Sequence, residues 1–218
     1  MKNYFSVKVI AALLALVALL GCLCACGKGA DEPSVTGTAG GETAAAGDHP
    51  QVKVTMENGK SFTIELYPEF APETVEHFLK LVDSGFYDGV PFHRVVKGFM
   101  AQGGDPDGDG NSNPGEETIH GEFAANGFTQ NTLSHTRGVV SMARSQDPDS
   151  ASSQFFICYS DNYTSSLDGS YAAFGKVIEG METVDEFTEG EFNYNSIGEL
   201  ASPVNPIIMA KAERVAAE

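Results

Sequence analysis

The chain has 218 residues, no Trp, 30 acidic and 13 basic side chains, and a formal net charge of −17. This length allows one ordinary domain with an appendage, and the 42% share of hydrophobic residues excludes a wholly disordered chain. The charge argues against a nucleic-acid partner, because few basic side chains are available to neutralise a row of phosphates. Four of the acidic and three of the basic residues lie in the first 50 positions, so the acidity belongs to the remainder of the chain.

The first 26 residues are typical of an export signal. Two lysines precede twelve apolar residues, Val9 to Leu20, which are too few to span a bilayer comfortably. A Leu three residues before a Cys resembles a bacterial lipobox, and this pattern ends at Cys22 and again at Cys26. We expect cleavage before one of these cysteines and acylation of its thiol. An ordinary secretory signal is the alternative.

Residues 27–50 are rich in Gly, Ala, Thr and acidic residues and show no apolar period, which predicts a flexible tether. From Gln51 the pattern becomes globular, and we expect a single domain over 51–218. Cys158 is the one cysteine beyond the tether, so it forms no disulfide within this domain. Its apolar neighbours predict a buried packing residue.

The domain begins with a predicted β-hairpin, because apolar and polar residues alternate over 52–56 and 62–66, on either side of a turn. Apolar residues at helical spacing predict a helix over 74–84, and a second short helix is expected at 181–188. Short apolar runs predict further strands at 92–96, 138–142, 154–159, 172–177 and 207–215. Many short strands with two helices favour an antiparallel barrel over a sheet of βαβ units.

Three stretches hold more specific information. They read FHRVVKGFMAQGGD at 92–105, GVVSMA at 138–143 followed by SSQFFI at 152–157, and LDGSYAAFGKV at 167–177. Together they resemble the cyclophilin family of peptidyl-prolyl cis/trans isomerases, and the resemblance runs from about Val52 to Val215. It implies a mainly β fold, namely a closed eight-stranded antiparallel barrel capped by two helices. It also implies an enzyme that accelerates isomerisation of X–Pro bonds.

The residue types in these stretches suit that reaction. An X–Pro bond isomerises slowly because amide resonance imposes a barrier of about 18–20 kcal/mol. No covalent bond is broken, so the reaction needs no nucleophile, metal or cofactor. It needs a dry pocket for the proline ring and a donor that stabilises the twisted amide. Arg94 is a permanently charged donor, and Gln102 and Gln154 can hold it and the substrate backbone.

The resemblance assigns roles to individual residues. Arg94 occupies the catalytic position, and the positions that contact substrate are held by Phe99, Met100, Gln102, Ala143, Gln154, Phe156 and Leu167. Tyr171 lies where many members have His. Arg144 lies where many members have Asn, and a shift in sequence preference is the expected effect. Ser166 replaces the Trp with which many members hold cyclosporin, so we expect weak cyclosporin binding and retained activity.

Two other functions remain open. The chain could be a non-catalytic module that binds proline-containing peptides. It could also be a Ca²⁺-binding surface protein, because residues 105–116 match the EF-hand loop template at each required position. Against calcium, no helix of adequate length precedes this loop, and Ser112 replaces the usual apolar residue. The histidines other than His93 show no metal-ligand or triad spacing.

The sequence therefore predicts a lipid-anchored, extracytoplasmic isomerase without a cofactor. It would act as a monomer on proline-containing segments of exported proteins and assist their folding. The expected location is the outer face of the plasma membrane or the periplasm.

Overall fold

The computed structural model describes residues 49–111 and 117–215. The predicted export signal, the two candidate lipid-attachment residues Cys22 and Cys26, nearly all of the tether, and residues 112–116 of the EF-hand-like loop lie outside the described residues. Within the described ranges, no helix is long and apolar enough to cross a membrane.

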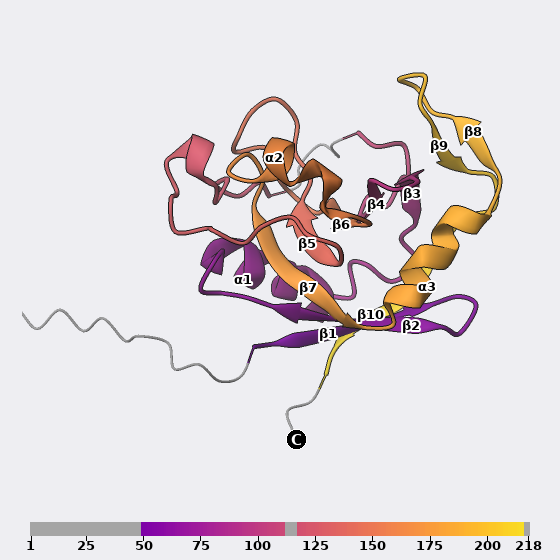
Figure 1. The fold of residues 1–218 in the computed structure, drawn as a ribbon. Helices are drawn as coiled ribbons and strands as arrows, with labels where there is room; N and C mark the ends of the chain where they lie inside the picture. The colour runs from indigo at the N-terminus through magenta and orange to yellow at the C-terminus, as the bar shows by residue number, and fades with distance from the viewer. Residues whose placement is uncertain (1–48, 112–116, 216–218) are drawn as a thin grey trace, which may run out of the picture. The chain divides into compact units, whose positions relative to one another are not determined.

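One antiparallel sheet of eight strands, in the order β10-β1-β2-β7-β5-β6-β4-β3, curls around the interior of the domain (Figure 1). The strands are β1 (Gln51–Met56), β2 (Ser61–Leu66), β3 (Phe92–Val96), β4 (Met100–Gly103), β5 (Val139–Met142), β6 (Phe155–Cys158), β7 (Ala173–Glu179) and β10 (Met209–Arg214). Seven of these are predicted from the sequence. β4 is not, because its four residues lie between glycine-containing turns and show no clear alternation.

The sheet is a half-barrel, so the prediction of a closed barrel was wrong. Its edge strands β10 and β3 share no ladder, and the residues just before them meet at an isolated bridge between Pro91 and Ile208. Beside this bridge the N–H of Phe92 donates to the carbonyl of Ile207 at 2.8 Å. On the other side of the bridge the N–H of Met209 donates to the carbonyl of Val90 at 3.0 Å, but the N–H of Val90 donates to the carbonyl of Tyr87 at 3.2 Å within a turn, so the pairing does not continue there as a ladder.

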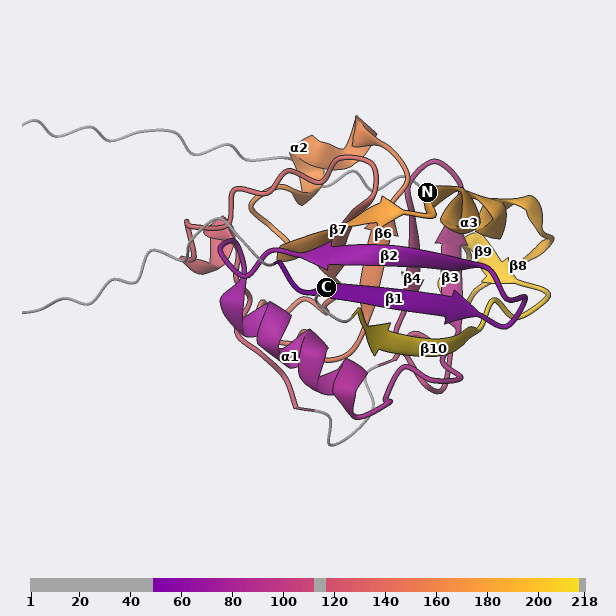
Figure 2. The ribbon, with the colours of Figure 1, turned by 90° about the horizontal axis from the view of Figure 1, so that it is seen from below.

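Two predicted helices are present. α1 (Pro72–Asp83) buries Val75, Phe78 and Val82 and runs alongside β10 and β1 (Figure 2). It begins two residues earlier than predicted, because proline is tolerated in the first turn of a helix. α3 (Met181–Asp185) continues into η3 (Glu186–Glu189) and matches the second predicted helix.

Several short elements were not predicted. They are η1 (Ala124–Asn126), η2 (Asp161–Tyr163), α2 (Thr164–Leu167), and a separate two-stranded hairpin of β8 (Phe192–Tyr194) and β9 (Leu200–Pro203). The hairpin stands beside β3 (Figure 1), and Ala201 of β9 is fully buried.

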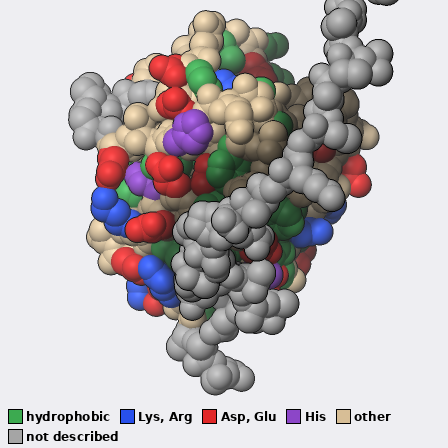
Figure 3. Space-filling view, turned by 90° about the vertical axis from the view of Figure 1, so that its left-hand side faces the viewer, with side chains coloured by type: hydrophobic (Ala, Val, Ile, Leu, Met, Phe, Trp, Pro, Cys, Tyr) green, Lys and Arg blue, Asp and Glu red, His purple; other side chains and the backbone are tan. Residues whose placement is uncertain are grey.

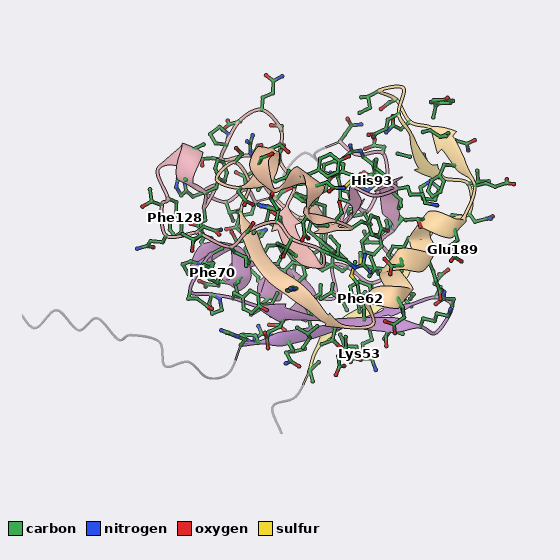
Figure 4. All side chains as sticks on the ribbon, viewed as in Figure 1. Lys53, Phe62, Phe70, His93, Phe128 and Glu189 are labelled. Carbon is green, nitrogen blue, oxygen red and sulfur yellow. The ribbon has the colours of Figure 1, made fainter. Side chains whose placement is uncertain are left out.

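Strand β6 separates two apolar clusters. Phe155 and Ile157 point into the main core, whereas Phe156 and Cys158 belong to a second, smaller cluster. Successive side chains of a strand point to opposite faces, so both faces of β6 are buried and its sequence reads as a continuous apolar run. Figure 4 shows Phe62 of the main core inside the domain and Lys53 at its surface, and Figure 3 shows charged side chains over one outer face. The second cluster forms the floor of the candidate site.

Candidate functional site

A pocket of about 130 Å³ lies over the second apolar cluster. Nine of the ten site residues predicted from the sequence line it: Arg94, Phe99, Met100, Gln102, Ala143, Arg144, Phe156, Leu167 and Tyr171. The tenth, Gln154, lines an adjoining hollow of about 110 Å³ together with Gln102, Ala143 and Arg144. The fold therefore brings the predicted residues together from strands and loops that are distant in the sequence.

The floor of the pocket is apolar and buried. Met100, Phe156 and Leu167 are at most 6% exposed, and Cys158 lies beneath them at 1%. The ladder between β4 and β6 fixes this arrangement, because Met100 pairs with Cys158 and Gln102 pairs with Phe156. Burial raises the pKa of the Cys158 thiol to about 12, so this residue packs as a neutral group, as the sequence predicts.

A chain of hydrogen bonds forms the polar wall. Arg94 of β3 lies opposite Gln102 of β4, and its Nη1 donates to Oε1 of Gln102 at 3.1 Å. The Nε2 of Gln102 donates to Oε1 of Gln154 at 2.9 Å, and Nε2 of Gln154 donates to the carbonyl of Asn111 at 2.9 Å. Each amide is thereby oriented, and the guanidinium is held beside the apolar floor.

Glu199 is a site residue that the sequence did not predict. Its carboxylate accepts hydrogen bonds from Nε of Arg94 at 2.6 Å and from Nη2 at 3.0 Å. The hydrogen bond to Arg94 lowers the pKa of the Glu199 carboxyl. The two residues are 105 positions apart, and the segment around Glu199 has no strand pattern. No sequence signal could have paired them.

Arg144 separates the pocket from the adjoining hollow. Its guanidinium lies over the rings of Tyr171, at 4.7 Å, and Phe123, at 5.0 Å. Nη2 donates to the carbonyl of Ser170 at 2.9 Å. Stacking and hydrogen bonding together fix this side chain, so its positive charge has a defined place at the rim.

An Asp–His–Ser arrangement with a buried His and Ser supports the floor from behind. One ring nitrogen of His135 lies 2.8 Å from Oδ1 of Asp168, and the other lies 2.9 Å from Oγ of Ser141. Burial lowers the pKa of His135, so the neutral ring donates to Asp168 and accepts from Ser141. The ring also stacks on Phe156, with 6.0 Å between centroids. Ser141 is fully buried, so this arrangement cannot act as a hydrolase triad and instead holds Phe156 in place.

The EF-hand-like loop shows no calcium geometry in its described part. The carboxylate of Asp105 accepts hydrogen bonds from the N–H groups of Asp107 at 3.1 Å and Gly110 at 2.7 Å. Asp109 accepts from the N–H of Asn111 at 2.8 Å. These acidic groups order the loop's own backbone. Among residues 49–111 and 117–215, no group of three or more His, Cys, Asp or Glu side chains is placed to hold a metal ion.

A larger hollow of about 510 Å³ lies between η3 and the base of the β8–β9 hairpin. It contains none of the predicted site residues, and its charged lining is formed by glutamates. No Lys or Arg is among the residues that line it in the described part of the chain, so it lacks the cationic donor that the predicted chemistry requires. The smaller pocket at Arg94 is therefore the candidate active site.

Comparison with known proteins agrees with this geometry. A family model described as cyclophilin type peptidyl-prolyl cis-trans isomerase/CLD matches residues 51–214. The chain belongs to this family. Peptidyl-prolyl cis-trans isomerase B of Bacillus subtilis is 43% identical over 136 residues, which cover 62% of this chain and 89% of the relative.

Solved structures of the family share the fold. A crystal structure of a cyclophilin type isomerase from Cryptosporidium parvum has a TM-score of 0.66 and 30% identity, and the match covers 78% of this chain and 100% of that one. A crystal structure of the same protein in the presence of the dipeptide Ala-Pro has a TM-score of 0.64 and 31% identity, with 77% and 99% covered. The family and the activity expected from the sequence motifs are thus confirmed: this cyclophilin is a peptidyl-prolyl cis-trans isomerase.

Proposed function

We propose that this cyclophilin isomerises X–Pro bonds in exported proteins, with Arg94 as the catalytic residue. The observation that carries the catalytic assignment is the position of the Arg94 guanidinium, which lines an apolar pocket and is held by Gln102. The likeness to a cyclophilin structure determined with Ala-Pro supports a proline-containing peptide as the occupant.

The pocket suits the chemistry of amide rotation. The proline ring would enter the space over Met100, Phe156 and Leu167, which excludes water. As the X–Pro bond twists, resonance is lost and the nitrogen becomes pyramidal and basic. A cationic N–H donor fixed beside that nitrogen stabilises the twisted state more than either planar state, and this difference is what accelerates the reaction.

The adjoining hollow would hold the peptide backbone. Gln102 and Gln154 line it with polar groups, and Ala143 leaves room between them. Arg144 and Tyr171 form the rim on which residues flanking proline would lie. Because Arg144 carries a fixed positive charge, we expect sequence preference to be determined here and not on the apolar floor.

An NMR exchange assay on an X–Pro peptide tests the catalytic assignment with the purified full chain. We expect acceleration by the wild type and a loss of about one to three orders of magnitude in Arg94→Ala, as on removal of an oxyanion-hole donor. Arg214→Ala is the matched control, because this arginine forms an exposed ion pair with Asp83 outside the pocket. Unchanged turnover in folded Arg94→Ala would overturn the assignment of Arg94.

The export signal predicted from the sequence supports a location outside the cytoplasm. There the mature chain would be a monomer held by a lipid on Cys22 or Cys26, with the tether between the lipid and the isomerase domain. Metabolic labelling with palmitate tests this proposal. Cys22→Ser or Cys26→Ser should abolish incorporation, and the variant that does so identifies the attachment residue. Incorporation that persists in the double variant contradicts the lipid anchor.

A further inference from the structure

The β8–β9 hairpin brings a carboxylate to the guanidinium of Arg94. Glu199 directly precedes β9, and its two oxygens accept from Nε and Nη2 at 2.6 Å and 3.0 Å. Arg94 is among the residues that line the pocket, whereas Glu199 is not. The carboxylate therefore holds the guanidinium from outside the pocket and leaves the space for substrate open.

One donor of Arg94 stays available. A guanidinium has five N–H groups in one plane, of which Glu199 uses two, Gln102 uses one and the Sδ of Met100, 3.8 Å from Nη1, takes a fourth. The second N–H of Nη2 is left for a substrate amide. Because Glu199 and Gln102 bind different nitrogens, they fix both the position of the guanidinium and the rotation of its plane.

The hairpin turn in turn fixes Glu199. The side-chain oxygen of Asn195 accepts from the N–H of Glu199 at 2.9 Å, and the N–H of Asn195 donates to the carbonyl of Glu199 at 2.9 Å. The Nδ2 of Asn195 also donates to the Glu199 carboxylate at 3.3 Å. At the base of the hairpin, Phe192 pairs with Pro203, and β9 packs against β3, which carries Arg94.

We propose that Glu199 is a positioning residue for isomerisation, acting through Arg94. This inference rests on the proposed catalytic role of Arg94. A carboxylate also offsets part of the positive charge that the reaction uses. However, the side chains of Arg94 and Glu199 are 26% and 31% exposed, so solvent screens this effect, whereas the geometric constraint remains. Positioning therefore outweighs neutralisation.

The test compares Glu199→Gln with Glu191→Gln in the full chain by NMR exchange on an X–Pro peptide. Both variants remove one negative charge from the same hairpin region, but Glu191 is exposed and lies outside the pocket. We expect kcat/KM to fall about threefold to tenfold in Glu199→Gln and to stay at the wild-type value in Glu191→Gln. The kcat/KM of Glu199→Asp, which keeps the charge but is one methylene shorter, should lie between the values of Glu199→Gln and the wild type. The NMR signal of the Arg94 Nε–H should shift in both Glu199 variants and should not shift in Glu191→Gln.

Introducing the Glu199 substitutions into the Arg94→Ala variant separates the proposed catalytic role of Arg94 from the proposed positioning role of Glu199. If Glu199 acts through Arg94, Glu199→Gln causes no further loss in that background. A further loss of equal size there shows a merely structural role and overturns the inference. So does unchanged or increased kcat/KM in Glu199→Gln with intact Arg94. By contrast, unchanged activity of Arg94→Ala rejects the catalytic assignment of Arg94. The contact between Arg94 and Glu199 would still be reported by the Nε–H signal of Arg94 in the wild type and the Glu199 variants.

Discussion

Replacing His135 by Phe tests whether the Asp168–His135–Ser141 arrangement is structural. A phenyl ring keeps the shape that stacks on Phe156 but removes the hydrogen bonds to Ser141 and Asp168. Ser141 is fully buried, so its hydroxyl loses its hydrogen-bond partner without gaining water, at a cost of about 1–3 kcal/mol. Asp168 is 39% exposed at its side chain and keeps its bonds from Ser134 and the His135 N–H, so its loss is small.

His135→Phe should therefore lower the free energy of unfolding by about 2 kcal/mol, and the loss comes mainly from the unsatisfied hydroxyl of Ser141. In a domain of this size that corresponds to a fall in Tm of about 4–8 °C. Adding Ser141→Ala removes the unsatisfied hydroxyl, so the double variant should recover most of the stability even though it has lost one more polar group.

Urea and thermal unfolding of the wild type, the two single variants and the double variant measure this coupling. Isomerase activity should stay within a few-fold of wild type in His135→Phe, because Phe156 remains supported. Additive destabilisation in the double variant would refute the account of Ser141. Loss of activity in a folded His135→Phe variant would show that the His135 network acts in the reaction and does not only support the floor.

Three further predictions concern pH, calcium and cyclosporin. Burial lowers the pKa of His93 and His135 below the ordinary value of 6.5, so the unfolded chain binds protons that the folded chain does not. Their contribution to stability is present above about pH 6.5 and is lost as the pH falls below it; a urea midpoint that is unchanged between about pH 7.5 and 5.5 contradicts this. Titration calorimetry with millimolar Ca²⁺ should give no saturable heat, because Asp105 already binds loop N–H groups, and a stoichiometric heat would restore the EF-hand interpretation of residues 105–116. Cyclosporin should inhibit weakly, because Ser166 donates back to the carbonyl of Tyr163 at 2.9 Å and offers no indole; nanomolar inhibition in the exchange assay would contradict this.

The sequence predicted well those parts of the fold in which local pattern and local structure coincide. The alternation in β1 and β2 and the helical spacing in α1 each correspond to one buried face. The set of pocket residues was predicted because all but Arg144 lie in the motifs at 92–105, 138–143, 152–157 and 167–177, and Arg144 directly follows one of them. Closure of the sheet was not predictable in this way, because it depends on whether β3 and β10, more than 100 residues apart, can exchange hydrogen bonds next to Pro91.

The same limit applies to contacts within the site. Gln102 lies opposite Arg94 across a short hairpin, so a motif can suggest that pairing. Glu199 and His135 reach the site from segments whose own sequence has no strand or catalytic pattern, and only the packing of β9 on β3 and of His135 on Phe156 gives them a role. Sequence therefore predicted the residues that line the pocket, whereas the groups that orient them became visible only in three dimensions.

The division between residues that line the pocket and residues that orient them fits a reaction in which no covalent bond is made or broken. A donor held in one fixed orientation lowers the barrier for an amide that rotates against it, so under the proposed role of Arg94 the precision of its placement matters as much as its charge. Gln102 fixes the guanidinium from one side through the β3–β4 ladder, and Glu199 fixes it from another through the β8–β9 hairpin. A long, flexible side chain acts as a rigid donor here because two separate parts of the fold hold it at different nitrogens.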